Sequence, residues 1–357
     1  MARWPETPLT ELLGLSLPIV LAPMAGSGTP ELAAAVSDAG GLGSLGCGSA
    51  EPAAIPQMVA QMRRRTEGPF NLNFFAHRAP VPDPGIRSRA VERLAPYYRE
   101  LGIAPPADAA EQPGPGFSDA ALQALLASPP PVVSFHFGLP ELDTVARLKG
   151  AGCRILATAT SVAEARALEA DGVDAVIAQG WEAGGHRGAA EIEDAGSGVG
   201  LMALLPQVVD AVSVPVIAAG GIADGRGIAA ALMLGASGVQ LGSAFLSCPE
   251  AGISAAHRRA IATARDSDTT LTLAYSGRPC RLRRNRYVTE MARDTVPVPD
   301  FPLTYALTAP LRAAEDPERS EDFQFFLYGQ GAAMNRAIPA AVLVATLAAE
   351  TAAALRG

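Results

Sequence analysis

Residues 179–188, with the sequence QGWEAGGHRG, combine reactive side chains with four glycines directly after an apolar run. The segment contains His186, one of four histidines in the chain, and its glycines leave space beside the ring for a flat ligand or substrate. Because the pKa of an unperturbed imidazole lies near neutrality, histidine is a natural general base. His186 is therefore the first candidate catalytic residue, and a histidine of an exposed loop is the alternative.

A second candidate histidine stands at the end of another apolar run, VVSFHF at 132–137. His136 and Ser134 share one face of a strand, and His136 falls at its last turn, so we expect it at the mouth of the fold. A hydrogen-bonded core histidine is the alternative. His77 and His257 lack supporting neighbours and are predicted to be ordinary surface residues. The absence of an HExxH pattern or a supporting thiolate argues against a metal site.

Short β-rich runs separated by helical stretches must position these side chains. Eight candidate strands lie at 18–23, 41–46, 70–75, 132–137, 154–160, 174–180, 215–221 and 238–246. Several of the alanine- and leucine-rich stretches between them end in glycine, the usual residue at a left-handed helix C-terminus. The strands are nearly continuous apolar runs, as expected for parallel strands buried on both faces. Eight such units predict an α/β fold of the (β/α)8 TIM-barrel type.

Two regions depart from this alternation. Residues 76–129 are long for one connection and rich in proline, so we expect an elaborated loop with an extra helix after strand three. Residues 266–330 follow strand eight and carry the basic cluster RLRRNR (281–286), which suits either a solvated face or an anion-attracting rim. We predict one structural unit, in which residues 1–265 and 331–357 form the barrel and 266–330 is a substrate-side insertion packed on it.

The composition excludes several classes of protein. The chain has 357 residues, 49% of them hydrophobic, and a formal net charge of −8, which suits a large folded core. An acidic chain without a basic stripe argues against nucleic acid as a partner. The sequence shows no apolar stretch that could span a membrane, no secretory signal and no disulfide framework. We therefore expect a cytoplasmic protein with reduced thiols, either a monomer or a weak homo-oligomer, that binds no membrane.

Polar and glycine residues gather at the ends of the predicted strands, where barrels of this type carry their chemistry. Gly220 and Gly221 end the seventh strand and precede a helix that begins near Asp224, while Gly242 and Ser243 end the eighth. Backbone N–H groups beside glycines attract an anion, and so does a helix N-terminus. The seventh and eighth strands therefore predict a phosphate site, with tight turns that bind nothing as the alternative.

Side-chain amides complete this pattern. Asn71, Asn73 and Gln179 stand near strand ends, and amides can match a heterocycle edge that alternates N–H and C=O groups. Together with a phosphate site and a histidine base, they predict a phosphate-bearing cofactor, for which flavin mononucleotide (FMN) is the best fit. The run GLGSLG at 41–46 matches the GxGxxG dinucleotide fingerprint, but it is itself a predicted strand after a helix, so we reject that interpretation.

These segments resemble the nitronate monooxygenase family, formerly called 2-nitropropane dioxygenases, over nearly the whole chain. LAPMAG, NLNFF, VVSFHFGLP, QGWEAGGHRG, VPVIAAGGIADGRG and VQLGSAFL occur in the order and spacing of the family, and SFHFG with EAGGHRG favours its class I branch. The resemblance implies an FMN-dependent barrel enzyme whose partners are O2 and a small nitronate or nitroalkane. Such an enzyme oxidises alkyl nitronates, propionate 3-nitronate among them, to a carbonyl compound and nitrite.

The resemblance also implies roles for individual residues. His186 would be the catalytic base and His136 a second active-site histidine. Tyr305 would meet the substrate, since Phe301 and Ala309 stand where polar residues are expected, which bears on substrate preference. Contacts to FMN would come from Ala22, Pro23, Met24, Asn71, Asn73, Gln179, Gly184, Gly185, Gly220, Gly221, Gln240, Leu241, Gly242, Ser243 and Gln330.

Two other functions are compatible with the same fold. The first is an FMN barrel reductase that uses NAD(P)H, of the enoyl-acyl-carrier-protein reductase or quinone reductase type. The second is a barrel without catalytic activity that binds a phosphorylated metabolite, although such a protein has little need for two histidines at the mouth of the barrel.

Overall fold

The computed structural model describes residues 4–106, 116–191, 198–293, 296–314 and 321–357. The bridge between Val20 and Leu42 brings the first strand beside the second, so that the sheet is nearly closed. Each strand falls within its predicted run, and the predicted (β/α)8 barrel is confirmed. Its eight parallel strands are β1 (Ile19–Leu21), β2 (Gly43–Gly46), β3 (Phe70–Phe75), β4 (Val132–His136), β5 (Arg154–Ala159), β6 (Ala175–Gln179), β8 (Val216–Ala219) and β9 (Gly238–Leu241).

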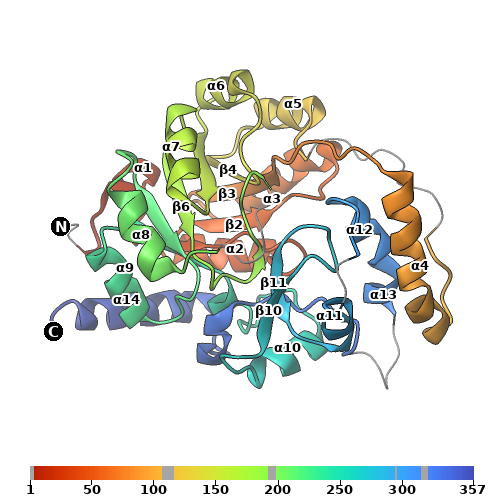
Figure 1. Cartoon of the computed structure of the whole chain (residues 1–357). Coiled ribbons are helices and arrows are strands. Elements are labelled where there is room, and N and C mark those ends of the chain that lie inside the picture. Colours follow the sequence, from red (N-terminus) through yellow and green to blue (C-terminus); the bar gives the residue numbers. More distant parts are fainter. Residues whose placement is uncertain (1–3, 107–115, 192–197, 294–295, 315–320) are drawn as a thin grey trace.

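Helices surround the barrel (Figure 1). Several begin at a hydroxyl that accepts a backbone N–H bond, as Thr29, Ser118 and Ser161 do. Their apolar faces pack on the outward side chains of the strands and form the largest core. The helices of this layer are α2 (Pro30–Asp38), α3 (Ile55–Arg65), α5 (Asp119–Ala127), α6 (Leu142–Gly150), α7 (Val162–Ala170), α8 (Leu201–Val209), α9 (Gly225–Met233) and α14 (Ala340–Ala354), the last packing against α9 and α2.

A short helix, α1 (Pro8–Leu13), closes the amino-terminal end of the barrel. Its Leu9 and Leu13 join a buried cluster with inward-facing side chains of the strands, among them Val132 and Ile217. Thr7 caps the helix, and its hydroxyl donates to the carbonyl oxygen of Ser237 at 2.6 Å. With this end filled, the carboxyl ends of the strands are left to hold a site.

The connection after β3 and the insertion after β9 pack together into a second core. Leu94 and Tyr98 of α4 (Pro84–Glu100) lie in one cluster with Tyr275, Tyr287 and Leu307. The expected extra helix is therefore α4, and residues 107–115 of the same connection lie outside the described residues. The division into barrel and insertion stays an interpretation, because α4 lies in the segment assigned to the barrel but packs against the insertion. α10 (Ala255–Ala262) precedes the insertion, which contains α11 (Arg286–Met291), α12 (Leu303–Leu307) and α13 (Ala309–Ala313).

A small antiparallel sheet joins the insertion to the loop after β6. It comprises β10 (Thr269–Thr272), β11 (Cys280–Arg283) and the two-residue β7 (Gly185–His186). In its register Cys280 stands opposite His186. The insertion thereby fixes the backbone of the principal candidate histidine.

Two arginines of the basic cluster 281–286, Arg281 and Arg286, have structural roles that neither interpretation of the sequence included, whereas Arg284 is exposed. Arg281 is buried, and its guanidinium donates to the carbonyl oxygen of Trp181 at 2.9 and 3.1 Å and to Thr269 Oγ1 at 3.0 Å. These bonds tie β11 to the segment that follows β6.

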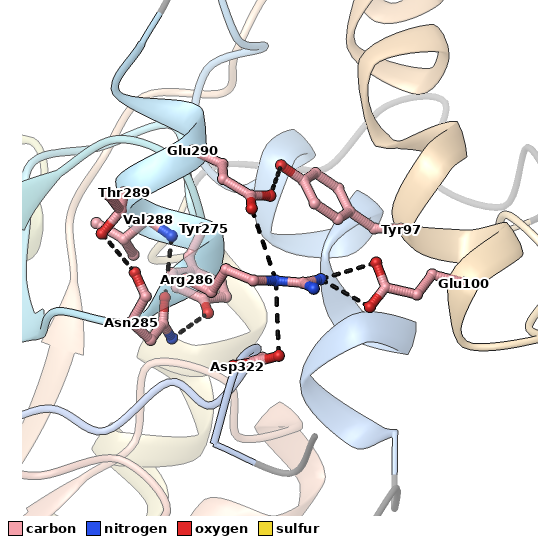
Figure 2. Close-up of polar contacts among 9 residues, drawn as sticks. All are labelled: Tyr97, Glu100, Tyr275, Asn285, Arg286, Val288, Thr289, Glu290 and Asp322. Carbon is pink, nitrogen blue, oxygen red and sulfur yellow. Dashed lines mark hydrogen bonds and ion pairs between the residues drawn. The ribbon is translucent and has the colours of Figure 1, made fainter. Parts of the chain in front are cut away.

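Arg286 lies among three carboxylates (Figure 2). Its guanidinium is 2.8 Å from Glu100, 3.5 Å from Asp322 and 3.8 Å from Glu290. Glu290 also accepts the hydroxyl of Tyr97 at 2.9 Å. Since Tyr97 and Glu100 belong to α4, this network fastens α4 to the insertion.

We expect Arg286→Met to lower the free energy of unfolding by about 1 kcal/mol, because half-exposed ion pairs contribute only modestly even in a network. Urea unfolding would measure it, and the deficit should shrink at high salt, which screens such pairs. Arg284→Met is the matched control, since Arg284 is exposed and its described bond is made by its backbone. Equal losses in both variants would show that the carboxylates around Arg286 add nothing.

Candidate active site

A cavity of about 530 Å³ opens at the carboxyl ends of the strands, a volume typical of small-molecule sites. The strand ends form the floor of this cavity. Its walls come from the loop after β6, the insertion and the segment before α14. Most of the residues expected from the sequence meet here. They are His136, His186, Ala22, Pro23, Met24, Asn73, Gln179, Gly184, Gly185, Gly220, Gly221, Gln240, Gly242, Ser243 and Tyr305.

Three of the expected residues lie outside the described lining. Asn71 is buried below it, where its amide donates to the hydroxyls of Ser44 and Ser134 at 3.1 and 2.9 Å. Leu241 faces the core between strands and helices, and the side chain of Gln330 is exposed. Asn71 is linked to the cavity only indirectly. The Ser134 hydroxyl that accepts its amide also accepts a hydrogen bond from Asn73, which lines the cavity, at 2.9 Å.

His186 is held in one tautomer. Its Nε2 lies 2.9 Å from the hydroxyl oxygen of Ser276, and that hydroxyl donates its single proton to the carbonyl oxygen of Arg278 at 3.0 Å. The oxygen of Ser276 must therefore accept a bond from Nε2–H. This leaves the lone pair of the imidazole on Nδ1, which is the atom able to take a proton.

Side chains at the ends of β4 and β6 hold the backbone of the loop that carries His186. The backbone carbonyl oxygen of His186 accepts hydrogen bonds from Gln179 Nε2 at 3.0 Å and from His136 Nε2 at 3.1 Å. Gln179 Oε1 accepts the Gly188 N–H at 2.8 Å, and His136 Nδ1 lies 3.1 Å from the hydroxyl of Thr158. Both ends of the Gln179 amide and Nε2 of His136 thus hold this loop, while Nδ1 of His136 is paired with Thr158 of β5.

The histidines around the cavity are neutral at pH 7. Burial lowers the pKa of His186 to about 3, and the nearby positive charge of Arg278 acts in the same direction. Burial likewise lowers the pKa of His136 to about 4. The imidazole of His186 is therefore neutral throughout the physiological pH range and keeps a lone pair that can accept a proton, although the lowered pKa makes it a weaker base than a free histidine.

His77 and His257 are not surface residues, which corrects the expectation from the sequence. They are 7% and 6% exposed, and both line the cavity. The ring of His77 lies edge-on to Phe301 with centroids 4.8 Å apart, and that of His257 stacks on Phe326 at 4.8 Å. Burial lowers the pKa of each to about 4. Their sequence neighbours gave no signal because these contacts come from a distant part of the chain.

Four buried polar atoms on the cavity wall have no hydrogen-bond partner within the described ranges. They are His77 Nδ1, His257 Nε2, Gln240 Oε1 and the hydroxyl of Tyr328. An unpaired polar group that is buried costs free energy, so the residues that carry these atoms are candidates to bond a polar ligand that occupies the cavity. The sequence gave no signal for Tyr328, which reaches the cavity from the segment before α14.

The turn after β8 depends on two glycines that pack closely against the segment after β6. Gly220 and Gly221 have φ values of 111° and 72°, which glycine adopts without strain. At the neighbouring strand end, the hydroxyl of Ser243 accepts the Gly329 N–H at 2.8 Å. A side chain at Gly184 would place its Cβ 2.4 Å from the nitrogen of Gly329. The segment before α14 therefore closes tightly over one side of the cavity.

Other kinds of site find no support in the part of the chain that the structure describes. There, no three His, Cys, Asp or Glu residues are grouped to hold a metal ion, and no helix has the length and apolar character of a membrane span. The four cysteines are free and buried.

A TIM barrel with a histidine-containing cavity at the carboxyl ends of its strands has the architecture of an enzyme. The family model described as nitronate monooxygenase matches residues 6–350. A nitronate monooxygenase from Pseudomonas aeruginosa is 44% identical over 343 residues, which cover 96% of this chain and 98% of the relative. The chain belongs to the nitronate monooxygenase family, and it is an oxidoreductase.

Solved structures show the same fold over the whole chain. Nitroalkane oxidase from Streptomyces ansochromogenes superposes with a TM-score of 0.89 at 43% identity, covering 98% of this chain and 99% of that one. FabK from Thermotoga maritima superposes with a TM-score of 0.75 at 29% identity, covering 98% and 97%. The resemblance inferred from the strand-end motifs is confirmed.

Proposed function

We propose that this protein oxidises alkyl nitronates with FMN as cofactor and O2 as oxidant, and releases a carbonyl compound and nitrite. The observation that carries the proposal is the neutral His186, with its lone pair on Nδ1, on the wall of a cavity that has four unpaired polar atoms. Membership of the nitronate monooxygenase family supports the reaction class.

The residues on the cavity wall fit FMN. Backbone N–H groups at Gly220, Gly221 and Ser243, beside the N-terminus of α9, would hold the phosphate. The unpaired atoms of Gln240 and His257 would bond to polar groups of the cofactor. FMN, when bound, would supply one-electron oxidation of the nitronate and reaction with O2. Asn73, Gly184, Gly185, Gly242 and residues 22–24 would add contacts to the cofactor.

The side chains of the protein have distinct tasks in this proposal. Nδ1 of His186 would remove the α-proton when a neutral nitroalkane enters, whereas a nitronate has already lost that proton. Ser276 would keep the lone pair on Nδ1, and His136 would hold the loop through the carbonyl oxygen of His186. Tyr305, which lines the cavity and is 36% exposed, would contact the substrate.

The visible spectrum of the purified protein tests the proposal. We expect a yellow protein whose flavin band bleaches when ethyl nitronate is added anaerobically, and recovers with nitrite release when O2 is admitted. Bleaching by NADH, but not by nitronate, would instead support an NAD(P)H-dependent reductase. A colourless protein that takes up no FMN would support a barrel that only binds a metabolite. Monomeric or weakly oligomeric assembly and cytoplasmic location remain predictions.

We expect Ser276→Ala to lower kcat/KM for neutral nitroethane about tenfold, the value of one hydrogen bond, because the lone pair of His186 is then free to shift to Nε2. Turnover of ethyl nitronate, which needs no base, should change much less. Steady-state oxygen consumption with both substrates measures the difference. Ser276→Thr keeps the hydroxyl and should restore activity with nitroethane; equal losses on both substrates would mean that Ser276 only supports the fold.

A further inference from the structure

Aromatic rings surround His186 on the cavity wall. The centroid of its ring lies 5.5 Å from that of Phe301, 6.3 Å from that of Phe75 and 6.3 Å from that of Phe325. Tyr305 continues this wall, 6.5 Å from Phe301 and 6.0 Å from Phe325. All four aromatic residues line the cavity. A substituent of a substrate that reacts at His186 would therefore lie against apolar surface.

No Asp, Glu, Lys or Arg is found among the described residues that line this cavity. Two guanidiniums lie close to rings at this cavity, and each is engaged by backbone carbonyl oxygens and a ring. Arg278 donates to the carbonyl oxygens of residues 189 and 190 and stacks 4.1 Å from the centre of the Phe137 ring. Arg312 lies 3.6 Å from the centre of the Tyr305 ring and donates to the carbonyl oxygen of Tyr305 at 2.9 Å. Neither belongs to the lining.

The histidines do not replace the missing cation. His77, His136 and His186 are held neutral at pH 7 by burial, and His136 has both ring nitrogens committed. A carboxylate on the substrate would lose its hydration and meet no cationic side chain of the described lining, which is strongly unfavourable. An alkyl group would be favoured by the same surface, because burying apolar area releases it from water.

We propose that the enzyme selects nitronates and nitroalkanes with an uncharged alkyl substituent over those that carry a carboxylate. This inference rests on the proposed function and narrows its substrate class. The inference argues against propionate 3-nitronate, which the family resemblance includes among the substrates, as the natural substrate of this protein. The nitronate group is common to both kinds of substrate, so the selection acts on the substituent alone.

The test compares two nitronates of similar size, butyl-1-nitronate and propionate 3-nitronate, with the FMN-loaded enzyme. We expect kcat/KM to be at least about tenfold higher for the butyl compound, mostly through KM. If kcat/KM were equal or higher for propionate 3-nitronate, the inferred substrate class would be wrong, but the proposed oxidation of nitronates would still stand. Failure of both to turn over would refute the proposed function.

Binding decides the substrate class independently of turnover. Anaerobic calorimetry with the neutral 1-nitrobutane and the anionic 3-nitropropionate should show tighter binding of 1-nitrobutane, and the reverse order would overturn the inference. Arg312→Gln is the second arm, because Arg312 is the cation beside Tyr305. It should leave the ratio of the two kcat/KM values unchanged. A selective loss with propionate 3-nitronate would show that Arg312 recognises a carboxylate.

Phe325→Ala examines the wall itself. Removing this ring, which is half-buried beside His186, should lower kcat/KM for butyl-1-nitronate several-fold more than for ethyl nitronate, whose substituent is too short to use the full wall. Phe325→Leu keeps an apolar side chain and should retain most of the preference. Equal losses on both nitronates in Phe325→Ala would exclude this ring from recognition of the substituent.

Discussion

His186→Asn is expected to lower kcat/KM for neutral nitroethane by about 10³-fold, within the range that a general base contributes. Asparagine can still form a hydrogen bond near Ser276, but it has no lone pair basic enough to take the α-proton. Ethyl nitronate arrives without that proton, so its oxidation should stay within about tenfold of wild type. Oxygen consumption and nitrite release, measured with both substrates, give the two values.

The content of bound FMN is the control for this variant, since the histidine ring lies on the wall of the same cavity. The ratio of flavin to protein absorbance should remain that of the wild type. If the nitroalkane and the nitronate lost activity equally, His186 would be excluded as the base.

The pH profile provides a second measure of the same residue. Because burial lowers the pKa of His186 to about 3, its imidazole is already neutral at pH 5. We therefore expect kcat/KM for nitroethane to show no fall between about pH 7 and pH 5, whereas a base with the ordinary pKa of histidine would lose activity below about pH 6.5. A fall of that kind would mean that the binding of FMN raises the pKa of His186, or that another group is the base.

The barrel was predictable because its signal is local and repeated. Parallel strands buried on both faces must be apolar along their length, and each of the eight apolar runs contains the observed strand. The sheet of β7, β10 and β11 was not predictable in this way, since β7 has only two residues and pairs with a segment about 95 positions later. The shared core of α4 and the insertion likewise depends on contacts over long sequence separations.

The candidate site was predictable where strand ends and glycine turns carry it. His136 and His186 met there because parallel strands end at one rim of a barrel. Leu241 was wrongly expected to contact the cofactor. Side chains alternate between the two faces of a strand, so Leu241 faces the core when Gln240, its neighbour on β9, faces the cavity. His77 and His257 escaped prediction because the aromatic rings that bury them come from residues 301 and 326, and no local pattern encodes those contacts.

Gly221→Asp is expected to weaken FMN binding by about 100-fold or more, because two like charges a few ångströms apart in a partly buried site repel by several kcal/mol. In the proposal, the phosphate lies at the turn formed by Gly220 and Gly221. Titration of the apoprotein with FMN, followed by quenching of flavin fluorescence, measures the dissociation constant. The purified variant should be colourless.

Gly221→Asn separates charge from shape in this test. Asparagine has the size of aspartate and tolerates the φ of 72° better than most residues, and either side chain would place its Cβ 3.2 Å from Cβ of Glu182. Strain and crowding are therefore nearly the same in the two variants, and the ratio of their dissociation constants reports the charge alone. We expect the asparagine variant to retain FMN at least tenfold more tightly than the aspartate variant. Equal affinities would place the phosphate away from β8, because the added carboxylate would then not repel it.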